Sequence, residues 1–267
     1  MVDLKSSAGL PIFLDDSAQR EFTFGENLIV ERVKARTATE LRGVLLEEPG
    51  VPEDTSLYLM YDGIYREKDR ALIKRSRLRY DLTLIFPGTI GTEYIKTAGH
   101  YHSLSRDTIH SYPELYEVLY GTLHFILQKR GKENNQIEDA VLAISERGER
   151  IVVPPDYGHV AVNPGNEPLV LANWIADECT SDYKTMREYR GGVYYEKKSN
   201  GSYRLIENRH YKKIPPLRKI KTDKERASIF NFQDIPLLYD ILLERPHTLN
   251  WLLDPKDAMD RFEAYMK

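Results

Sequence analysis

From residue 56 to about residue 176 the chain consists of short runs rich in Tyr, Ile, Val, Leu and Thr. The runs fall at residues 56–61, 80–86, 115–120, 122–128, 150–153 and 169–175. Turns that contain glycine or proline, such as Pro87-Gly88 and Pro164-Gly165, separate them. β-Branched and aromatic residues favour strands, whereas Gly and Pro favour turns. Because no βαβ rhythm is present, the pattern predicts an antiparallel sandwich or a small barrel.

The segments on either side of these strands have a different pattern of hydrophobic and polar residues. The first twenty or so residues show no regular pattern and are expected to form a loose arm, whereas residues 37–48 have helical character. After residue 223 no strand alternation is evident, and residues 235–243 and 257–266 are predicted to form short amphipathic helices. We therefore divide the chain into an N-terminal arm and helix (1–55), a barrel (56–213) and a helical C-terminal extension (214–267).

Composition narrows the class of protein. Lys and Arg number 38 against 41 Asp and Glu, and the net charge of −3 provides no basic field for nucleic acid or anionic membranes. No apolar run approaches the roughly 18–20 residues of a membrane span, and the N-terminus lacks the apolar core of a signal peptide. The single cysteine, Cys179, excludes an internal disulfide framework and is typical of a reducing compartment. We therefore expect a soluble, cytoplasmic protein that binds neither nucleic acid nor membrane.

Two histidines, His100 and His102, provide the first indication of chemistry. In a strand, residues i and i+2 point the same way, so the pair directs two imidazoles into one space, as a divalent metal requires. Two partly exposed strand histidines with no function would be the commoner case, so the interpretation depends on further ligands. Three candidates follow along the chain: Glu114, His159 and His110.

Strand parity separates these candidates further. Glu114 and Tyr116 share one face of their predicted strand, whereas Glu117 points the other way and is expected in solvent. His124 alternates within an apolar strand and is expected to be structural. Three imidazoles and one carboxylate suit a divalent ion such as Fe, Mn, Ni or Zn, with one or two positions left open for substrate.

The order and spacing of these residues resemble the two motifs of the cupin superfamily. Gly-His-x-His at residues 99–102, followed by Glu114 and Gly121, resembles the first motif, and the Gly148, Pro154, His159 and Asn163 spacing resembles the second. The match extends over about residues 79–213 and looks like the cupin-type glucose-6-phosphate isomerases of archaea and some bacteria. The segments that carry it are residues 83–88, 97–102, 114–116, 151–163 and 174–177.

This resemblance implies a fold, a cofactor and a reaction. The fold would be a mainly β, cupin-type antiparallel barrel (jelly roll), usually homodimeric. One divalent metal ion per subunit, with Fe expected and Mn, Ni or Zn as alternatives, would be held by His100, His102, Glu114 and His159. The reaction would interconvert glucose 6-phosphate and fructose 6-phosphate in glycolysis and gluconeogenesis.

The resemblance also implies which residues touch the phosphorylated sugar. Glu114 and Tyr116 would be catalytic, and the substrate contacts would be Thr83, Thr97, Gly99, Tyr116, Trp174 and Tyr183. Hydroxyls and a backbone N–H would form a neutral phosphate cradle, which a lysine or arginine normally supplements. Lys96 is adjacent to this cradle, but strand parity aims it away, so we expect it in solvent.

The chain departs from the family pattern at several positions. Glu114 follows His102 by twelve residues, more than is usual in the family, so an inserted loop containing His110 is expected at the cavity mouth. Trp174 stands where the family often has a tyrosine, Ser181 replaces a histidine, and Asp156 replaces a small or aromatic residue. These changes leave two alternatives open: an Fe-dependent cupin dioxygenase and a non-catalytic sugar-phosphate-binding cupin.

Overall fold

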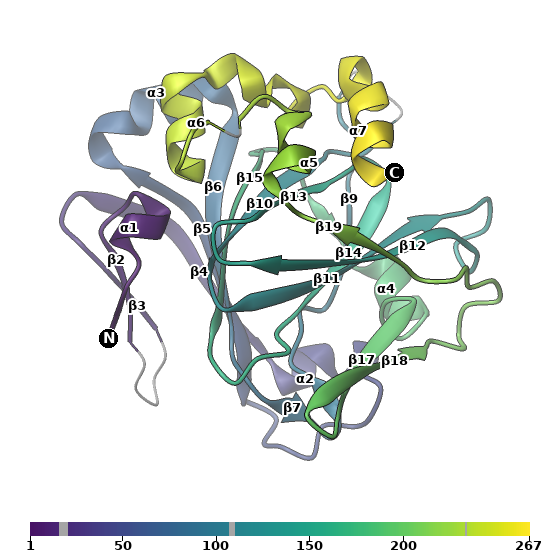
Figure 1. The fold of residues 1–267 in the computed structure, drawn as a ribbon. Helices are drawn as coiled ribbons and strands as arrows, with labels where there is room; N and C mark the ends of the chain where they lie inside the picture. Colours follow the sequence, from purple (N-terminus) through teal and green to yellow (C-terminus); the bar gives the residue numbers. More distant parts are fainter. Residues whose placement is uncertain (16–20, 107–109, 233) are drawn as a thin grey trace.

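The computed structural model describes residues 1–15, 21–106, 110–232 and 234–267, and its centre is a barrel formed by two β-sheets (Figure 1). The larger sheet has six strands in the order β13-β10-β15-β6-β5-β4. Their bounds are β4 Leu28–Thr37, β5 Ser56–Arg66, β6 Leu78–Ile85, β10 Glu114–Tyr120, β13 Arg150–Val153 and β15 Leu169–Ala176. The smaller sheet has the order β14-β11-β12-β19, with β11 Thr122–Arg130, β12 Ile137–Glu146, β14 Tyr157–Val162 and β19 Arg218–Lys221.

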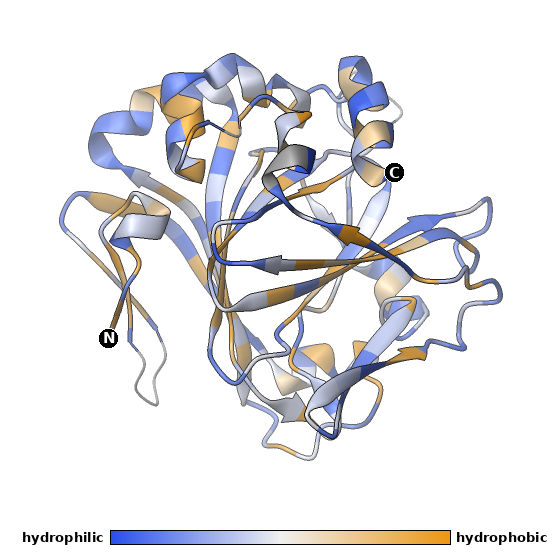
Figure 2. Ribbon diagram, viewed as in Figure 1, coloured by the Kyte–Doolittle hydropathy of each residue, from blue (hydrophilic) through white to orange (hydrophobic). Residues whose placement is uncertain are grey.

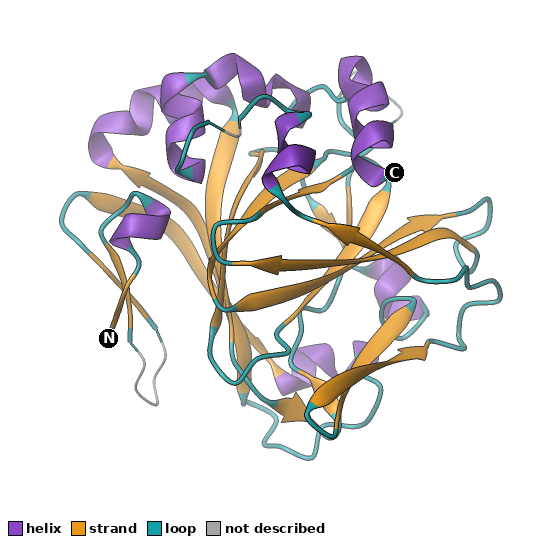
Figure 3. Cartoon of the chain, viewed as in Figure 1, coloured by secondary structure: helices purple, strands orange, loops and turns teal. Residues whose placement is uncertain are grey.

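The strand pairing confirms the expected fold class, a mainly β antiparallel barrel of the cupin type. Within the two large sheets every pairing is antiparallel except that of β12 with β19, which is parallel. All six predicted strands are present (Figure 3). The other four strands of these two sheets, β4, β12, β14 and β19, were not predicted. Buried hydrophobic residues of the strands and helices form the core between these elements, and Figure 2 shows hydrophobic residues along both.

Smaller elements surround the barrel. The helical turns are α2 Ala38–Leu41, η1 Arg42–Val44, η2 Glu67–Asp69, α3 Arg70–Ser76 and α4 Lys184–Glu188. The short strands are β7 Thr89–Ile90, β8 Glu93–Tyr94, β9 Tyr101–His102, β16 Ser181–Asp182, β17 Tyr194–Ser199 and β18 Ser202–Glu207. The predicted helix at residues 37–48 is real only over its first half, because a 3-10 turn follows α2. Thr37 and Glu40 form a capping box at its start.

The N-terminal residues form ordered structure, so the expectation of a loose arm is wrong for residues 1–15. The elements β1 Val2–Asp3, α1 Lys5–Ala8, β2 Ile12–Leu14 and β3 Phe22–Phe24 build a three-stranded sheet. Leu4, Leu10 and Ile12 are fully buried. Gly9 packs against Leu237, far along the chain, and such long-range burial leaves no periodic trace in the local sequence. The rest of the expected arm, residues 16–20, lies outside the described residues.

The C-terminal extension covers the outer face of the larger sheet. Its helices are α5 Lys224–Ser228, α6 Leu238–Glu244, η3 Pro246–Leu252, η4 Lys256–Ala258 and α7 Met259–Met266, which confirms the two predicted helical segments. The Tyr265 hydroxyl accepts a hydrogen bond from the Val152 backbone N–H (3.1 Å). No helix in the described ranges is long and apolar enough to cross a membrane.

Two charged residues that were expected in solvent are buried. Glu117 is 2% exposed and lies 2.6 Å from the Arg150 Nε, while the two terminal nitrogens of Arg150 donate to the carbonyls of Phe232 and Ile235. Burial, which outweighs the neighbouring guanidinium, raises the pKa of the Glu117 carboxyl to about 7. Lys96 is also 2% exposed, and its Nζ donates to the Val44 carbonyl (2.7 Å). Strand parity placed both side chains away from the barrel interior, but another layer of the fold covers that outer surface.

Candidate metal centre

Four side chains converge inside the barrel, where the two large sheets face each other. His100, His102, Glu114 and His159 each offer one ligand atom, and these atoms all lie within 4.8 Å of one another. Glu114 begins β10 of the larger sheet, His159 lies on β14 of the smaller sheet, and His102 ends β9. The structure therefore brings together the four residues that the resemblance implied as metal ligands.

Local backbone geometry accounts for the placement of the histidines. His100 and His159 are paired by two backbone hydrogen bonds, of 3.3 and 3.0 Å, and the ring centroids of His100 and His102 are 5.1 Å apart. Between them Tyr101 points to the opposite side and packs over Gly158, where an added Cβ would lie 2.6 Å from the tyrosine ring. A larger residue at position 158 would therefore displace Tyr101 and with it the segment that carries His100 and His102.

The ligand atoms have the features of a site that is completed by a cation. The His102 Nδ1 donates a hydrogen bond to the Tyr112 carbonyl (2.7 Å), so its Nε2 carries the free lone pair. Within the described structure, His102 Nε2, Glu114 Oε2 and His159 Nε2 are buried without a hydrogen-bond partner. Burying such atoms unpaired is costly. A divalent ion bound by three imidazoles and one carboxylate would satisfy all of them.

The protonation states agree with metal binding. Burial, reinforced by the neighbouring imidazoles, holds the pKa values of His100 and His159 well below the usual range of histidine. Both rings are therefore neutral at pH 7, and the neutral imidazole is the form that binds metal.

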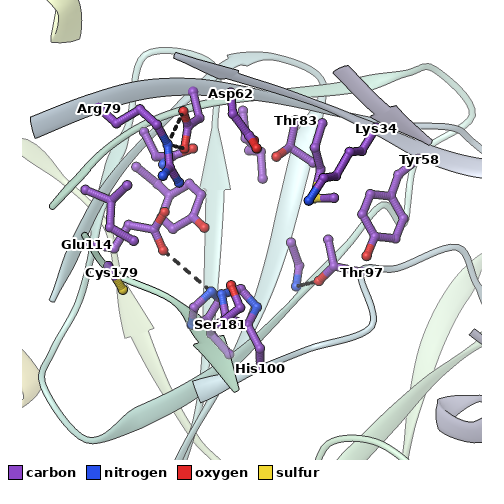
Figure 4. A pocket seen from close by; sticks show the side chains of 18 of the residues that line it. Lys34, Tyr58, Asp62, Arg79, Thr83, Thr97, His100, Glu114, Cys179 and Ser181 are labelled. Carbon is purple, nitrogen blue, oxygen red and sulfur yellow. Dashed lines mark hydrogen bonds and ion pairs between the residues drawn. The ribbon is translucent and has the colours of Figure 1, made fainter. Parts of the chain in front are cut away.

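The cluster opens into a cavity of about 350 Å³ that several of the predicted substrate residues line. Thr83, Thr97, Tyr116 and Tyr183 all face it together with His100, Glu114 and His159. The Thr97 Oγ1 accepts a hydrogen bond from the Ala161 backbone N–H (3.0 Å), which leaves its own proton available to a ligand. Figure 4 shows Thr83 and Thr97 on one side of the cavity and Glu114 on the other.

Tyr116 and Tyr183 approach the ligand cluster from different elements. Tyr116 follows Glu114 at i+2 on β10, and burial, together with the Glu114 carboxylate, raises its pKa well above the usual value. The Tyr116 hydroxyl therefore stays protonated and can donate. Tyr183 lies with its ring centroid 5.3 Å from that of His100 and accepts a hydrogen bond from the Arg36 guanidinium (3.5 Å).

Trp174 does not take part in this cavity, which corrects its assignment as a substrate contact. It is fully buried on the outer face of β15, where its Nε1 donates to the Leu238 carbonyl (2.8 Å) and its ring packs against Tyr80. Its strand neighbours Asn173 and Ile175 line the cavity instead. Because side chains alternate along a strand, a residue between two cavity-lining neighbours must point away.

Two further expectations need correction. Gly99 adopts a left-handed conformation (φ +74°) and packs beneath Val160, so it does not line the cavity. His110 lies at a different cavity, where its Nδ1 is 3.0 Å from the Asp156 carboxylate. The described parts of the segment between His102 and Glu114 do not line the metal cavity, and thus they are not its mouth.

A charged wall of the cavity was not predicted from the sequence. This wall comes from three neighbouring strands and consists of Arg32, Lys34 and Arg36 on β4, Asp62 on β5, and Arg79 and Asp81 on β6. Burial raises the pKa of Asp81 to about 7 even though the Arg79 Nε lies 2.9 Å away. On β6 the wall could have been predicted from strand parity, because Arg79, Asp81 and Thr83 lie on the same face of the strand. On β4 the signal was hidden because that segment was assigned to the arm.

The barrel and its four-ligand cluster define the class of protein, a cupin-type barrel with a candidate metal centre. A family model described as glucose-6-phosphate isomerase (GPI) matches residues 35–214. The chain belongs to the glucose-6-phosphate isomerase family.

Curated relatives with that name are identical to this chain at roughly a quarter or more of the aligned positions. The glucose-6-phosphate isomerase of Pyrococcus abyssi is 29% identical over 182 residues, covering 66% of this chain and 87% of the relative. That of Pyrococcus horikoshii is 27% identical over 194 residues, covering 70% and 93%. A bacterial relative from Sinorhizobium medicae is 28% identical over 137 residues, covering 51% and 59%.

Solved structures similar to part of the chain include a vicilin and an oxalate decarboxylase. Vicilin from hazelnut (Corylus avellana) matches with a TM-score of 0.34 and 14% identity, over 52% of this chain and 34% of that one. Oxalate decarboxylase from Bacillus subtilis matches with a TM-score of 0.33 and 20% identity, over 52% and 30%.

Proposed function

We propose that this chain is a metal-dependent aldose–ketose isomerase that interconverts glucose 6-phosphate and fructose 6-phosphate. The observation that carries the proposal is the arrangement of one cavity. The candidate metal ligands His100, Glu114 and His159 line it together with Thr83 and Thr97, in a chain of the glucose-6-phosphate isomerase family. A sugar held there would have its reacting end at the ligand cluster and its phosphate at the threonines.

The isomerisation moves a hydrogen between C1 and C2 and a proton between O1 and O2. A divalent ion bound by the four ligands would stabilise negative charge that develops on the sugar oxygens. We assign Glu114 as the group that carries the proton between the two carbons. Because ligation to a metal lowers the basicity of a carboxylate, a hydride shift is the competing route. The two routes differ in whether the carbon-bound hydrogen exchanges with solvent.

Tyr116 and the two threonines have supporting roles in this proposal. Since its raised pKa keeps the Tyr116 hydroxyl protonated, Tyr116 acts as a hydrogen-bond donor to a sugar oxygen and not as a base. The Thr97 hydroxyl, already accepting from Ala161, donates its proton to a phosphate oxygen, and Thr83 does the same from β6. Tyr183, beside His100, contacts the sugar near the ligand cluster.

A coupled assay for fructose 6-phosphate, with and without a chelator, tests the proposal. Purified, metal-loaded protein should convert glucose 6-phosphate, lose turnover with the chelator, and regain it when a divalent metal is restored. Failure of the metal-loaded protein to convert the sugar would overturn the proposal. Oxygen uptake with candidate substrates would then support a dioxygenase, and phosphosugar binding without turnover would support a non-catalytic binding protein.

The proposal also covers the metal, the assembly and the cellular role, which come from the resemblance. We propose iron as the native metal, a homodimer as the assembly, and a cytoplasmic enzyme of glycolysis and gluconeogenesis. Elemental analysis of protein purified without chelator tests the metal, and light scattering tests the assembly. A different metal at full occupancy, or a monomeric mass, would contradict the respective part.

A further inference from the structure

The edge strand β4 directs a row of cations into the metal cavity. Arg32, Lys34 and Arg36 alternate along this strand, so they share one face, and all three line the cavity. Val33, between two of them, points away and is 56% exposed. The strand lies outside residues 79–213, over which the sequence resembles the cupin-type isomerases.

Most charges in the cavity wall are matched by a neighbour. Arg32 pairs with Asp62 (2.7 Å), and Arg79 pairs with Asp81 (2.9 Å). The third arginine of the wall, Arg36, pairs with Glu40 through Nη1 (2.8 Å). Among the described residues Lys34 has no carboxylate within ion-pair distance, and it is the unmatched cation of the wall.

The unmatched carboxylate of the cavity lies with the imidazoles. The Glu114 Oε2 is 3.2 Å from His102 Nε2 and 3.6 Å from His159 Nε2, as expected for ligands of one ion. Figure 4 shows Lys34 and Glu114 on opposite sides of the cavity. The wall is thus built for a molecule with a metal-binding end and an anionic end.

Sheet register places Lys34 beside the threonine cradle. Lys34 is opposite Met60 on β5, and Met60 is opposite Thr83 on β6, so the three residues form one row across the sheet. Two strand spacings separate the Cα atoms of Lys34 and Thr83 by about 10 Å. The four-carbon stem of lysine can extend over Met60, and Figure 4 shows Lys34 pointing into the cavity on the side of Thr83, Thr97 and Tyr58.

We propose that Lys34 recognises the phosphate of the substrate and supplies the positive charge that the threonine hydroxyls lack. This inference rests on the proposed function, since it names the group that selects a phosphorylated sugar over a neutral one. A phosphomonoester carries roughly −1.5 to −2 charges at pH 7, and lysine binds such an anion as a point charge. Lys34 is exposed to the cavity, so it loses little hydration before the anion arrives.

Arg36 has a different task in the same wall. Its guanidinium is held by Glu40 and lies over the Tyr183 ring, with its Cζ 5.3 Å from the ring centroid. Of these two cations, we assign Lys34 to the phosphate, beside the threonine hydroxyls, and Arg36 as a positioning residue for Tyr183.

The test replaces Lys34 and compares phosphate binding with turnover. Lys34→Met keeps the length of the stem and removes the charge, and Lys34→Arg restores the charge. Lys198→Met is the matched control, because Lys198 is exposed on β17 and does not line the cavity. The measurements on metal-loaded protein are kcat and KM for glucose 6-phosphate and, by calorimetry, the affinity for inorganic phosphate.

We expect Lys34→Met to raise KM and weaken phosphate binding by about ten- to a hundredfold, the usual effect of losing a charge-assisted hydrogen bond. The kcat should change little, Lys34→Arg should recover most of the affinity, and the control should match the wild type. The KM of the wild type should also rise more steeply with salt than that of Lys34→Met.

The outcomes separate this inference from the proposed function. If the wild type isomerises the sugar and Lys34→Met has unchanged KM and phosphate affinity, the inference falls while the isomerase stands. If the wild type does not isomerise but binds phosphate in a Lys34-dependent way, the isomerase falls while the anion site stands. Loss of kcat in Lys34→Met with unchanged KM and phosphate affinity would also overturn the inference, since Lys34 would then act in the chemistry.

Discussion

The His102 Nδ1 donates a hydrogen bond to the carbonyl oxygen of Tyr112, 2.7 Å away. Since a carbonyl can only accept, this contact places the proton on Nδ1 and turns the Nε2 lone pair toward Glu114 Oε2, at 3.2 Å. Tyr112 lies in the long segment between His102 and Glu114. That segment therefore orients a candidate ligand through the far side of its ring, a role different from the cavity mouth that its length suggested.

Replacing His102 with alanine should remove the candidate metal site. The variant leaves three ligands and loses the oriented Nε2, so metal affinity should fall by more than the roughly 10–100-fold that is typical of losing an outer partner of a ligand. Metal content after dialysis, measured by elemental analysis, checks this. His247→Ala is the control, because His247 is exposed on η3. Full metal content in the His102 variant would exclude His102 as a ligand.

Replacing Glu114 with glutamine should abolish turnover while the fold persists. Glutamine has nearly the same shape but cannot carry a proton, so kcat should drop by about 10²–10⁴-fold. Circular dichroism checks the fold, and metal content separates loss of the ligand from loss of the base. Solvent deuterium should enter C1 of the fructose 6-phosphate that the wild type forms. Unchanged activity in a metal-loaded variant would refute the base assignment.

Replacing Trp174 with phenylalanine should affect stability and leave substrate binding unchanged. The substitution removes the hydrogen bond to the Leu238 carbonyl and part of the buried ring, so unfolding should become easier by about 1–3 kcal/mol. Urea unfolding measures this loss, and KM for glucose 6-phosphate should stay at the wild-type value. A higher KM with undiminished stability would restore Trp174 as a substrate contact.

The stability of the wild type relative to Asp81→Asn should decrease as pH rises from 5 to 8. The folded-state pKa of Asp81 is about 7, against an ordinary value of 3.8, because burial disfavours the ionised form. The folded protein therefore holds this proton more tightly than the unfolded chain, and the resulting stabilisation is complete below pH 4 and lost as pH passes through 7.

Asparagine has no such proton. The unfolding free energy of the wild type minus that of Asp81→Asn should therefore fall by about 1–3 kcal/mol over that range. Denaturant unfolding at pH 5 and pH 8 measures it. If the wild type instead gains stability relative to the variant as pH rises, the attraction of Arg79, which lies 2.9 Å from Asp81, outweighs the effect of burial on the Asp81 pKa.

Local patterns were sufficient for six strands and, together with the family resemblance, for the four candidate ligands. Runs of β-favouring residues between turns placed β5, β6, β10, β11, β13 and β15, and period-two alternation put His100 with His102 and Glu114 with Tyr116 on common faces. The charged wall was only partly accessible in this way. Arg79 and Asp81 could have been found from Thr83, whereas Lys34 required the knowledge that β4 is an edge strand of the same sheet.

Glu117 and Lys96, the two charged residues expected in solvent, were misplaced for one physical reason. Parity states which side of a strand a side chain occupies, but it does not state what covers that side. Glu117 and Trp174 point outward as parity requires, yet the C-terminal extension covers them, and Lys96 is covered by the segment around Val44. The sequence by itself determined six of the strands, the candidate ligand set and the family. Only the tertiary structure decided which polar side chains are buried and which charge in the cavity has no partner, because both depend on contacts between segments that are distant along the chain.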